Sequence, residues 1–185
     1  MQELTRKLIH LVFGLGIAGM VLVLDHTTAT AILAGGLFFG IILVDLILRG
    51  YKLPVISALV KYADRCDPLP GKGALYFAIS ALACVIFFSK PVVIPALVSL
   101  AVLDGVATIA GTRFGRNRIY NGKSLEGTIT GIIITFVVLL LVMPVPGALV
   151  VAVSAGIIEM FSPVDDNLVI PISICILLTA VPGLL

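Results

Sequence analysis

The sequence predicts an all-α membrane protein with about seven transmembrane helices and a cytoplasmic N-terminus. Of its 185 residues, 60% are hydrophobic and 12% are charged, whereas soluble domains contain about 45–50% apolar and 25% charged residues. Apolar segments of near-transmembrane length recur along the chain, and the cations gather beside alternate ends of these segments. The composition therefore excludes a soluble or disordered chain. A net charge of +2 argues against a nucleic-acid-binding protein.

Seven apolar segments are the candidate transmembrane helices, because a helix needs about 20 residues to cross the hydrocarbon core. They are residues 8–24, 29–48, 74–88, 91–110, 129–143, 146–161 and 168–184. The first segment follows Arg6 and Lys7 but no Ala-x-Ala-like cleavage site closes it, so it is expected to be a span and not a signal peptide. Several segments are short, and one of them could be re-entrant. The chain is predicted to form a single membrane domain over residues 1–185.

Two polar stretches, residues 49–73 and 111–128, are predicted to be cytoplasmic loops. With the N-terminus inside, eleven of the twelve Lys and Arg residues lie on the cytoplasmic side and Lys90 alone lies outside. Most carboxylates share that side. Residues 53–63 of the first loop form either a short amphipathic helix in the membrane interface or an ordinary connector. Any chemistry is therefore expected at the cytoplasmic face.

Two short motifs resemble nucleotide-binding signatures but lack the required context. Gly14, Gly16 and Gly19 match GxGxxG inside an apolar segment, where small residues let helices approach closely. Residues 117–124 nearly match GxxxxGK[ST], with Asn117 in place of the first glycine and no preceding strand. Neither motif therefore predicts its usual fold.

The second loop nevertheless has the chemistry of a phosphate site. Its glycines allow close approach of the backbone to an anion, and the next helix begins near Thr128, where free amides favour a phosphate. The alternative is a loop whose cations only set the topology. The residues concerned are Arg113, Gly115, Arg116, Arg118, Lys123, Ser124, Gly127 and Thr128.

Carboxylates cluster at predicted inner helix ends and loops. Asp104 lies late in the fourth segment, where a carboxylate is costly unless it is paired with a cation or bound to a metal. Glu126, Glu159 and Asp166 belong to the same predicted side. Because Mg²⁺ binds one or two carboxylates together with substrate phosphates, we expect a magnesium site that includes Asp104, Glu126 and Asp166.

The histidine of the first segment and the cysteines can be explained by packing alone. His10 shares a helix face with Arg6 at i, i+4, and is either a ligand or catalytic group or a packed, hydrogen-bonded histidine. The cysteines, Cys66, Cys84 and Cys175, form no CxxC pair and are expected to be apolar packing residues.

Four blocks of the chain together resemble the CTP-dependent lipid kinases, the family of dolichol kinase, phytol kinase and CTP-dependent diacylglycerol kinase, which are distant relatives of the phosphatidate cytidylyltransferases. The blocks are Arg6-Lys7-x-x-His10; Gly71-Lys72-Gly73-Ala-Leu-Tyr76-Phe77; Asp104 to Gly115 with Lys123-Ser124-x-Glu126-Gly127-Thr128; and Glu159 with Asp166-Asn167 and Pro171.

The resemblance implies an integral membrane kinase that moves the γ-phosphoryl group of CTP to a lipid alcohol, with Mg²⁺ as cofactor. The acceptor would be a polyprenol, phytol or geranylgeraniol, or diacylglycerol, and oligomers are possible. Asp104, Lys123, Glu126, Asp166 and Asn167 are carried over as active-site candidates. The enzyme would lie in the cell membrane of a prokaryote or an endoplasmic-reticulum-type membrane of a eukaryote.

In the expected mechanism, Lys123, Arg113 and Arg116 hold the triphosphate, and Glu159 or Asp104 accepts the proton of the lipid hydroxyl. The paired-Asp signature of the cytidylyltransferases is not found, which favours the kinase. The long N-terminal extension of large dolichol kinases is also absent, which leaves dolichol open as the substrate. A cytidylyltransferase that makes a CDP-lipid and a small ion or solute transporter remain the alternatives.

Overall fold

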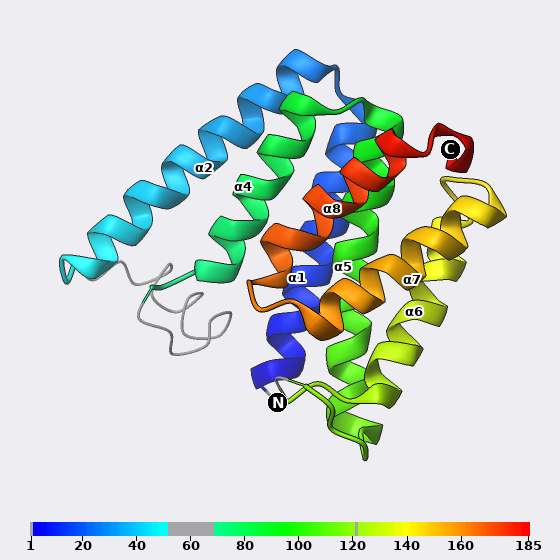
Figure 1. The fold of residues 1–185 in the computed structure, drawn as a ribbon. Coiled ribbons are helices and arrows are strands. Elements are labelled where there is room, and N and C mark those ends of the chain that lie inside the picture. The colour runs from blue at the N-terminus through cyan, green and yellow to red at the C-terminus, as the bar shows by residue number, and fades with distance from the viewer. Residues whose placement is uncertain (1, 52–68, 121) are drawn as a thin grey trace.

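The computed structural model describes residues 2–51, 69–120 and 122–185, and in these ranges every regular element is a helix (Figure 1). Residues 53–63, expected to form either an amphipathic helix or a connector, lie outside the described residues, as do Lys52, Lys61 and Arg65. The helices are α1 (Gln2–Val23), α2 (His26–Leu48), α4 (Lys72–Phe87), α5 (Lys90–Phe114), α6 (Leu125–Leu139), α7 (Val145–Phe161), α8 (Asp166–Ala180) and the short 3₁₀ helix η1 (Pro182–Leu184). The all-α class is confirmed, and each predicted apolar segment corresponds to one α-helix.

Several helix ends differ from the prediction: α1 begins at Gln2 and not at residue 8, and α5 ends at Phe114 and not at residue 110. α6 begins at Leu125 and not at residue 129, because the Ser124 hydroxyl caps it and accepts a hydrogen bond of 3.2 Å from the amide of Gly127. This earlier start places Glu126 in the first helical turn. α8 ends at Ala180, before residue 184, and Pro182 then begins η1, since proline has no amide to continue the helix.

Within the described residues, three helices are long and apolar enough to cross a membrane, namely α1 from Leu4, α2 and α5, whereas α4, α6, α7 and α8 are shorter apolar helices. α2 is almost uncovered, and its buried residues Ala29 and Leu33 both lie near its beginning. Figure 1 shows α2 at the edge of the bundle. Apolar helices with such exposed apolar surface are typical of a membrane protein.

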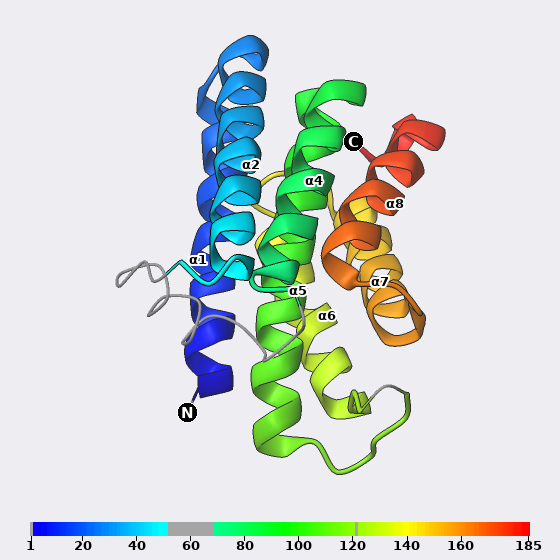
Figure 2. The same cartoon turned by 90° about the vertical axis from the view of Figure 1, so that its left-hand side faces the viewer.

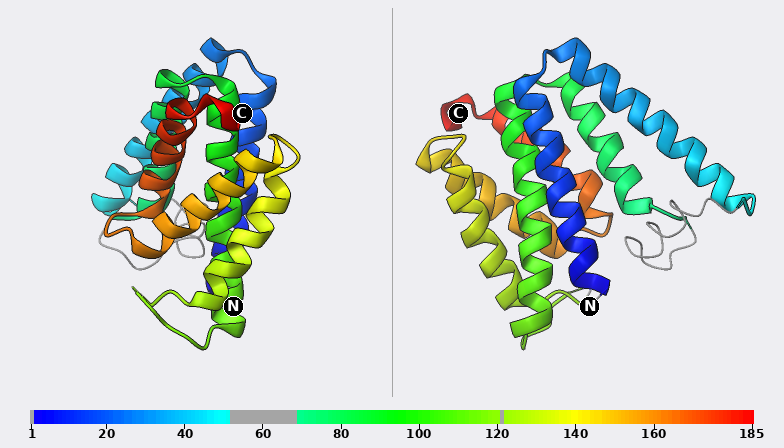
Figure 3. Two further views of the ribbon diagram at one scale, coloured as in Figure 1. Left: turned by 45° about the vertical axis from the view of Figure 1, so that its right-hand side comes forward. Right: turned by 180° about the vertical axis from the view of Figure 1, so that it is seen from behind.

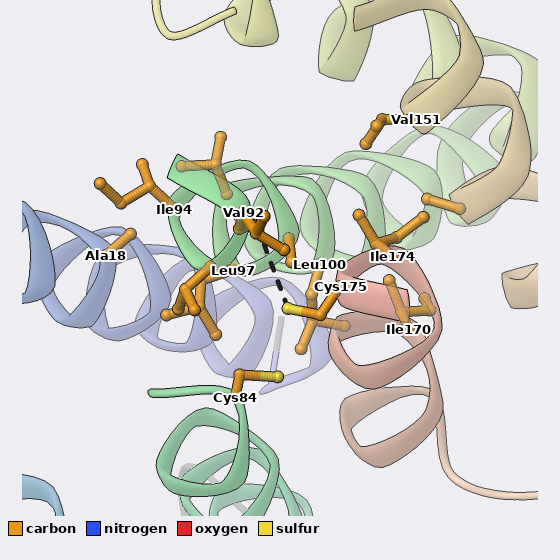
Figure 4. Close-up of a cluster of buried hydrophobic side chains, with 14 of the residues drawn as sticks. Ala18, Cys84, Val92, Ile94, Leu97, Leu100, Val151, Ile170, Ile174 and Cys175 are labelled. Atoms are coloured by element: carbon orange, nitrogen blue, oxygen red, sulfur yellow. Dashed lines mark hydrogen bonds between the residues drawn. The ribbon is translucent and has the colours of Figure 1, made fainter. Parts of the chain in front are cut away.

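Helix α5 is the axis of the bundle and packs against α1, α6, α7 and α8, while α4 packs beside α8 (Figure 2). Its side chains Leu97, Leu100 and Leu103 are fully buried. Cys84 and Cys175 lie in the same core, where the Cys175 thiol is 4.0 Å from the carbonyl oxygen of Val92 (Figure 4). These two cysteines are packing residues, as expected.

The polar residues lie mainly at one end of the bundle. Figure 3 shows the N-terminus and the α5–α6 loop (residues 115–124) at one end, and the C-terminus and the α1–α2 turn at the other. At the second end, the Lys90 ammonium donates to the carbonyl oxygen of Leu24, and Asp25 caps α2. The helices therefore deliver the loop and helix-end motifs of the first end to a common region.

Candidate functional site

An ion pair between α1 and α5 forms the first part of the site. The Lys7 ammonium donates to both carboxylate oxygens of Asp104, at 2.5 Å for Oδ2. Both residues are buried, with 7% and 6% of their surface exposed. The interpretation in which Asp104 pairs with a neighbouring cation is therefore confirmed. In the sequence, Lys7 stands out only as part of the Arg6-Lys7-x-x-His10 motif, and its i, i+3 spacing to His10 is the signal that both residues share a helix face.

His10 lies one turn beyond Lys7, beside the same carboxylate. Its Nε2 is 3.7 Å from Oδ2 of Asp104, which is too long for a hydrogen bond. Its ring packs edge-on against Phe77 of α4, with ring centroids 5.5 Å apart. The imidazole is thus packed, but among the described residues Nε2 has no hydrogen-bond partner.

A second network joins the α5–α6 loop to α7 and α8. The Lys123 ammonium lies 2.6 Å from Oδ2 of Asp166 and 2.9 Å from Oε1 of Glu159, and it also donates to the Glu159 carbonyl oxygen. The other Glu159 oxygen accepts a 3.1 Å hydrogen bond from the Thr128 hydroxyl. Burial by itself lowers the pKa of Lys123, but the two carboxylates outweigh it and raise this pKa above its usual value. Lys123 is therefore a permanent cation at neutral pH.

Glu126 has a different set of partners. Its oxygens accept from the backbone amides of Arg116 and Asn117 and from the Asn117 side-chain amide, the last at 2.8 Å. All these donors belong to the α5–α6 loop. Glu126 thus ties the loop to the first turn of α6.

The glycines of the second loop motif have a packing role in this structure. A Cβ atom on Gly127 would lie 2.5 Å from the Ala107 carbonyl oxygen, and one on Gly111 or Gly115 would lie within 2.8 Å of the Ser124 hydroxyl. These contacts are closer than atoms tolerate, so only glycine lets α5 and α6 approach here. The prediction that this backbone approaches an anion stays a prediction.

The remaining candidates lie around these networks. Arg113 and Arg116 are exposed. The Lys72 ammonium lies 5.5 Å from the centre of the Tyr76 ring. Arg6 is half-buried. Asn167 donates to the Asp165 carboxylate through its backbone and side-chain amides, while its buried Oδ1 has no hydrogen-bond partner among the described residues.

The described residues contain no group of three or more His, Cys, Asp or Glu side chains arranged to hold a metal ion. The expected ligands Asp104, Glu126 and Asp166 have separate partners. Glu159 and Asp166, by contrast, share the ammonium of Lys123. Two neighbouring carboxylates fit an ion that takes its other ligands from phosphates and water, so the donor chemistry of this pair suits a nucleotide-bound Mg²⁺.

Comparison with known proteins identifies relatives of this chain. No protein-family model matches the chain, and no solved structure matches it. An uncharacterized protein of Methanocaldococcus jannaschii is 37% identical over 177 residues, which cover 92% of this chain and 90% of that protein. A chloroplastic farnesol kinase of Arabidopsis thaliana is 31% identical over 69% of this chain. A probable chloroplastic phytol kinase 2 of Oryza sativa subsp. japonica is 28% identical over 93% of it.

The match covers 43% of the farnesol kinase and 64% of the phytol kinase, so these plant proteins are longer than the region they share with this chain. Their names agree with the family that the four sequence blocks resemble. The chain is thus a distant relative of the farnesol and phytol kinases, and this likeness supports a relationship to the lipid-kinase family.

Proposed function

We propose that the protein is an integral membrane kinase that transfers the γ-phosphoryl group of CTP to the hydroxyl of a lipid alcohol. The observation that carries the proposal is the pair of networks, Lys7–Asp104 and Lys123–Glu159–Asp166, at one polar end of a bundle of apolar helices. Phosphoryl transfer needs such cations and carboxylates for positioning and charge stabilisation. Because the named relatives are farnesol and phytol kinases, a prenyl alcohol is the favoured acceptor over diacylglycerol.

The proposed topology has seven spans in one domain and the polar end in the cytoplasm. The cation distribution supports this orientation. The four shorter helices would cross beside the longer α5, against which each of them packs. A lipid alcohol could then present its hydroxyl to the polar end while its tail stays in the bilayer.

In the proposed mechanism, Lys123 exchanges its carboxylate partners for phosphate oxygens of the nucleotide, and the exposed Arg113 and Arg116 add charge. Glu159 and Asp166, freed from Lys123, would hold Mg²⁺, which when bound neutralises charge on the β- and γ-phosphates. The lipid oxygen attacks the γ-phosphorus, the bond from that phosphorus to the bridging oxygen breaks, and CDP leaves. Asp104, held as a carboxylate by Lys7, accepts the hydroxyl proton.

The test is purified protein with labelled CTP, with ATP as the control nucleotide, and a panel of farnesol, phytol, geranylgeraniol, a polyprenol and diacylglycerol. Asp104→Asn should abolish labelling of the alcohol while the protein still inserts. Asp45→Asn is the matched control, because Asp45 is an exposed carboxylate on α2 that pairs with Arg49. Full labelling by Asp104→Asn would refute the assignment of Asp104.

Product analysis distinguishes the alternative reactions. The kinase forms CDP and a lipid phosphate, whereas a cytidylyltransferase releases pyrophosphate and forms a CDP-lipid. A transporter would consume no CTP, and would require polar residues along a path through both halves of the bundle.

A further inference from the structure

Glu126 joins the two ends of the α5–α6 loop. On the α6 side, it belongs to the first helical turn. On the α5 side, its two oxygens receive the backbone amides of Arg116 and Asn117 and the side-chain amide of Asn117, over 2.8–3.2 Å. A carboxylate that receives three N–H groups from one short segment determines the position of that segment.

Further contacts close the same loop beyond Glu126. The Leu125 amide donates to the Asn117 carbonyl oxygen at 2.9 Å. Asn117 therefore both accepts a hydrogen bond from α6 and donates one to it, through Glu126. Arg118 and Ser124 form an antiparallel bridge, and the Arg118 guanidinium donates to the Gly122 carbonyl oxygen. The loop is therefore a closed hairpin anchored on the first turn of α6.

Lys123 lies inside this hairpin, directly before the Ser124 that caps α6. From there its ammonium reaches Glu159 and Asp166, which belong to other helices. The place of Lys123 thus depends on the hairpin, and the hairpin depends on the Glu126 carboxylate. The hydrogen bonds of that carboxylate within the described residues go to Arg116 and Asn117 and not to Lys123, so its influence on Lys123 passes through the backbone.

We infer that Glu126 is a positioning residue whose carboxylate holds the α5–α6 hairpin closed and so places Lys123 and Arg116 for the nucleotide phosphates, and that it is not a metal ligand. This assignment differs from the expectation drawn from the sequence, in which Glu126 held magnesium. The kinetic part of the inference rests on the proposed function, whereas the structural part does not.

The kinetic test compares Glu126→Ala and Glu126→Gln with the unmodified protein. For Glu126→Ala, the KM for CTP should rise roughly tenfold, which corresponds to about 1.4 kcal/mol, while kcat changes by less than about twofold. Glu126→Gln keeps one acceptor oxygen, so its KM for CTP should lie between those of the unmodified protein and Glu126→Ala. Asn117→Ala should shift KM in the same direction but less, because it removes only the side-chain donor. Asp45→Ala is the control carboxylate variant and should leave KM unchanged.

A magnesium titration separates positioning from metal binding. If Glu126 only positions the loop, the Mg²⁺ concentration for half-maximal rate at saturating CTP stays within about twofold in Glu126→Ala. Loss of a metal ligand would raise that concentration by about tenfold or more, since even the loss of an outer-shell partner costs about 10–100-fold in metal affinity. That rise, with an unchanged KM for CTP at saturating Mg²⁺, would overturn the inference.

Hydrogen exchange provides a readout that needs no activity. In the absence of nucleotide, amides in the peptide that contains Arg116 and Asn117 should exchange faster in Glu126→Ala than in the unmodified protein, because their acceptor is gone. In Asp45→Ala this peptide should be unchanged. Unaltered exchange in Glu126→Ala would refute the positioning role. If the unmodified protein fails to use CTP but Glu126→Ala still shows the predicted faster exchange, the proposed function is refuted and the structural part of this inference stands.

Discussion

Replacing Lys7 by methionine removes one partner of the buried ion pair between α1 and α5. The change keeps most of the length of the side chain but leaves the Asp104 carboxylate without its two hydrogen bonds. Asp104 is 6% exposed, and His10, at 3.7 Å, is too far to replace the lost donor. The carboxylate is therefore left unpaired in the interior.

The expected cost follows from this geometry. Removing one member of a buried ion pair destabilises a protein by about 3–5 kcal/mol. For a chain of this size, each kcal/mol lowers Tm by about 2–4 °C, so Lys7→Met should lower Tm by roughly 6–20 °C. Asp104→Asn should lower Tm less than Lys7→Met does, because the long Lys7 side chain near the beginning of α1 can extend its ammonium toward the polar end. The double variant should be more stable than Lys7→Met alone, because it leaves no unpaired charge.

The assay is thermal unfolding of the four proteins in one detergent, followed by loss of helical signal. The unmodified protein, the two single variants and the double variant form a complete double-mutant cycle. If Lys7→Met lowers Tm by less than about 2 °C, or if the losses of the single variants simply add in the double variant, the pair does not couple α1 to α5 and the reasoning fails.

Two further predictions concern packing and pH. Gly127→Ala should destabilise the protein by about 1–3 kcal/mol, because the new Cβ would meet the Ala107 carbonyl oxygen at 2.5 Å and the Gly111 Cα at 2.9 Å. Gly35→Ala, whose Cβ would meet nothing within 4 Å, should stabilise α2 by about 0.5–1 kcal/mol. Equal Tm shifts of the two variants in detergent would contradict this prediction. The raised pKa of Lys123 means that its stabilisation is complete below the usual value of 10.5 and is lost as pH rises through the higher folded value. The difference in Tm between the unmodified protein and Lys123→Met should therefore not shrink between pH 7 and about 9.5, and should shrink only above about 10.5; a decrease near neutral pH would contradict the ion-pair assignment.

Much of the fold was predictable because its signals are local. A run of apolar residues long enough to approach membrane thickness predicts a helix without knowledge of its neighbours, and all the predicted segments proved to be helices. The ends were less predictable. The start of α6 at Leu125 depends on the Ser124 cap, and Ser124 is held by the close approach of Gly111 and Gly115 from α5.

The candidate site was predictable in its membership but not in its pairing. The sequence indicated Asp104, Lys123, Glu159 and Asp166 because charges are rare in this chain and costly at membrane depth. It did not indicate that Lys7 is the partner of Asp104, since 97 positions separate the two residues. It also grouped Glu126 with the magnesium ligands, whereas the structure gives its oxygens to the α5–α6 loop.

The sequence by itself determined that this chain forms apolar helices with its charges concentrated at one end, because hydropathy and charge are properties of the residues in order along the chain. Only the tertiary structure decided which cation neutralises which carboxylate. Lys123 reaches Asp166 across 43 positions because α6, α7 and α8 meet at that end of the bundle. Ion pairs depend on distances of a few ångströms, and those distances are set by helix packing.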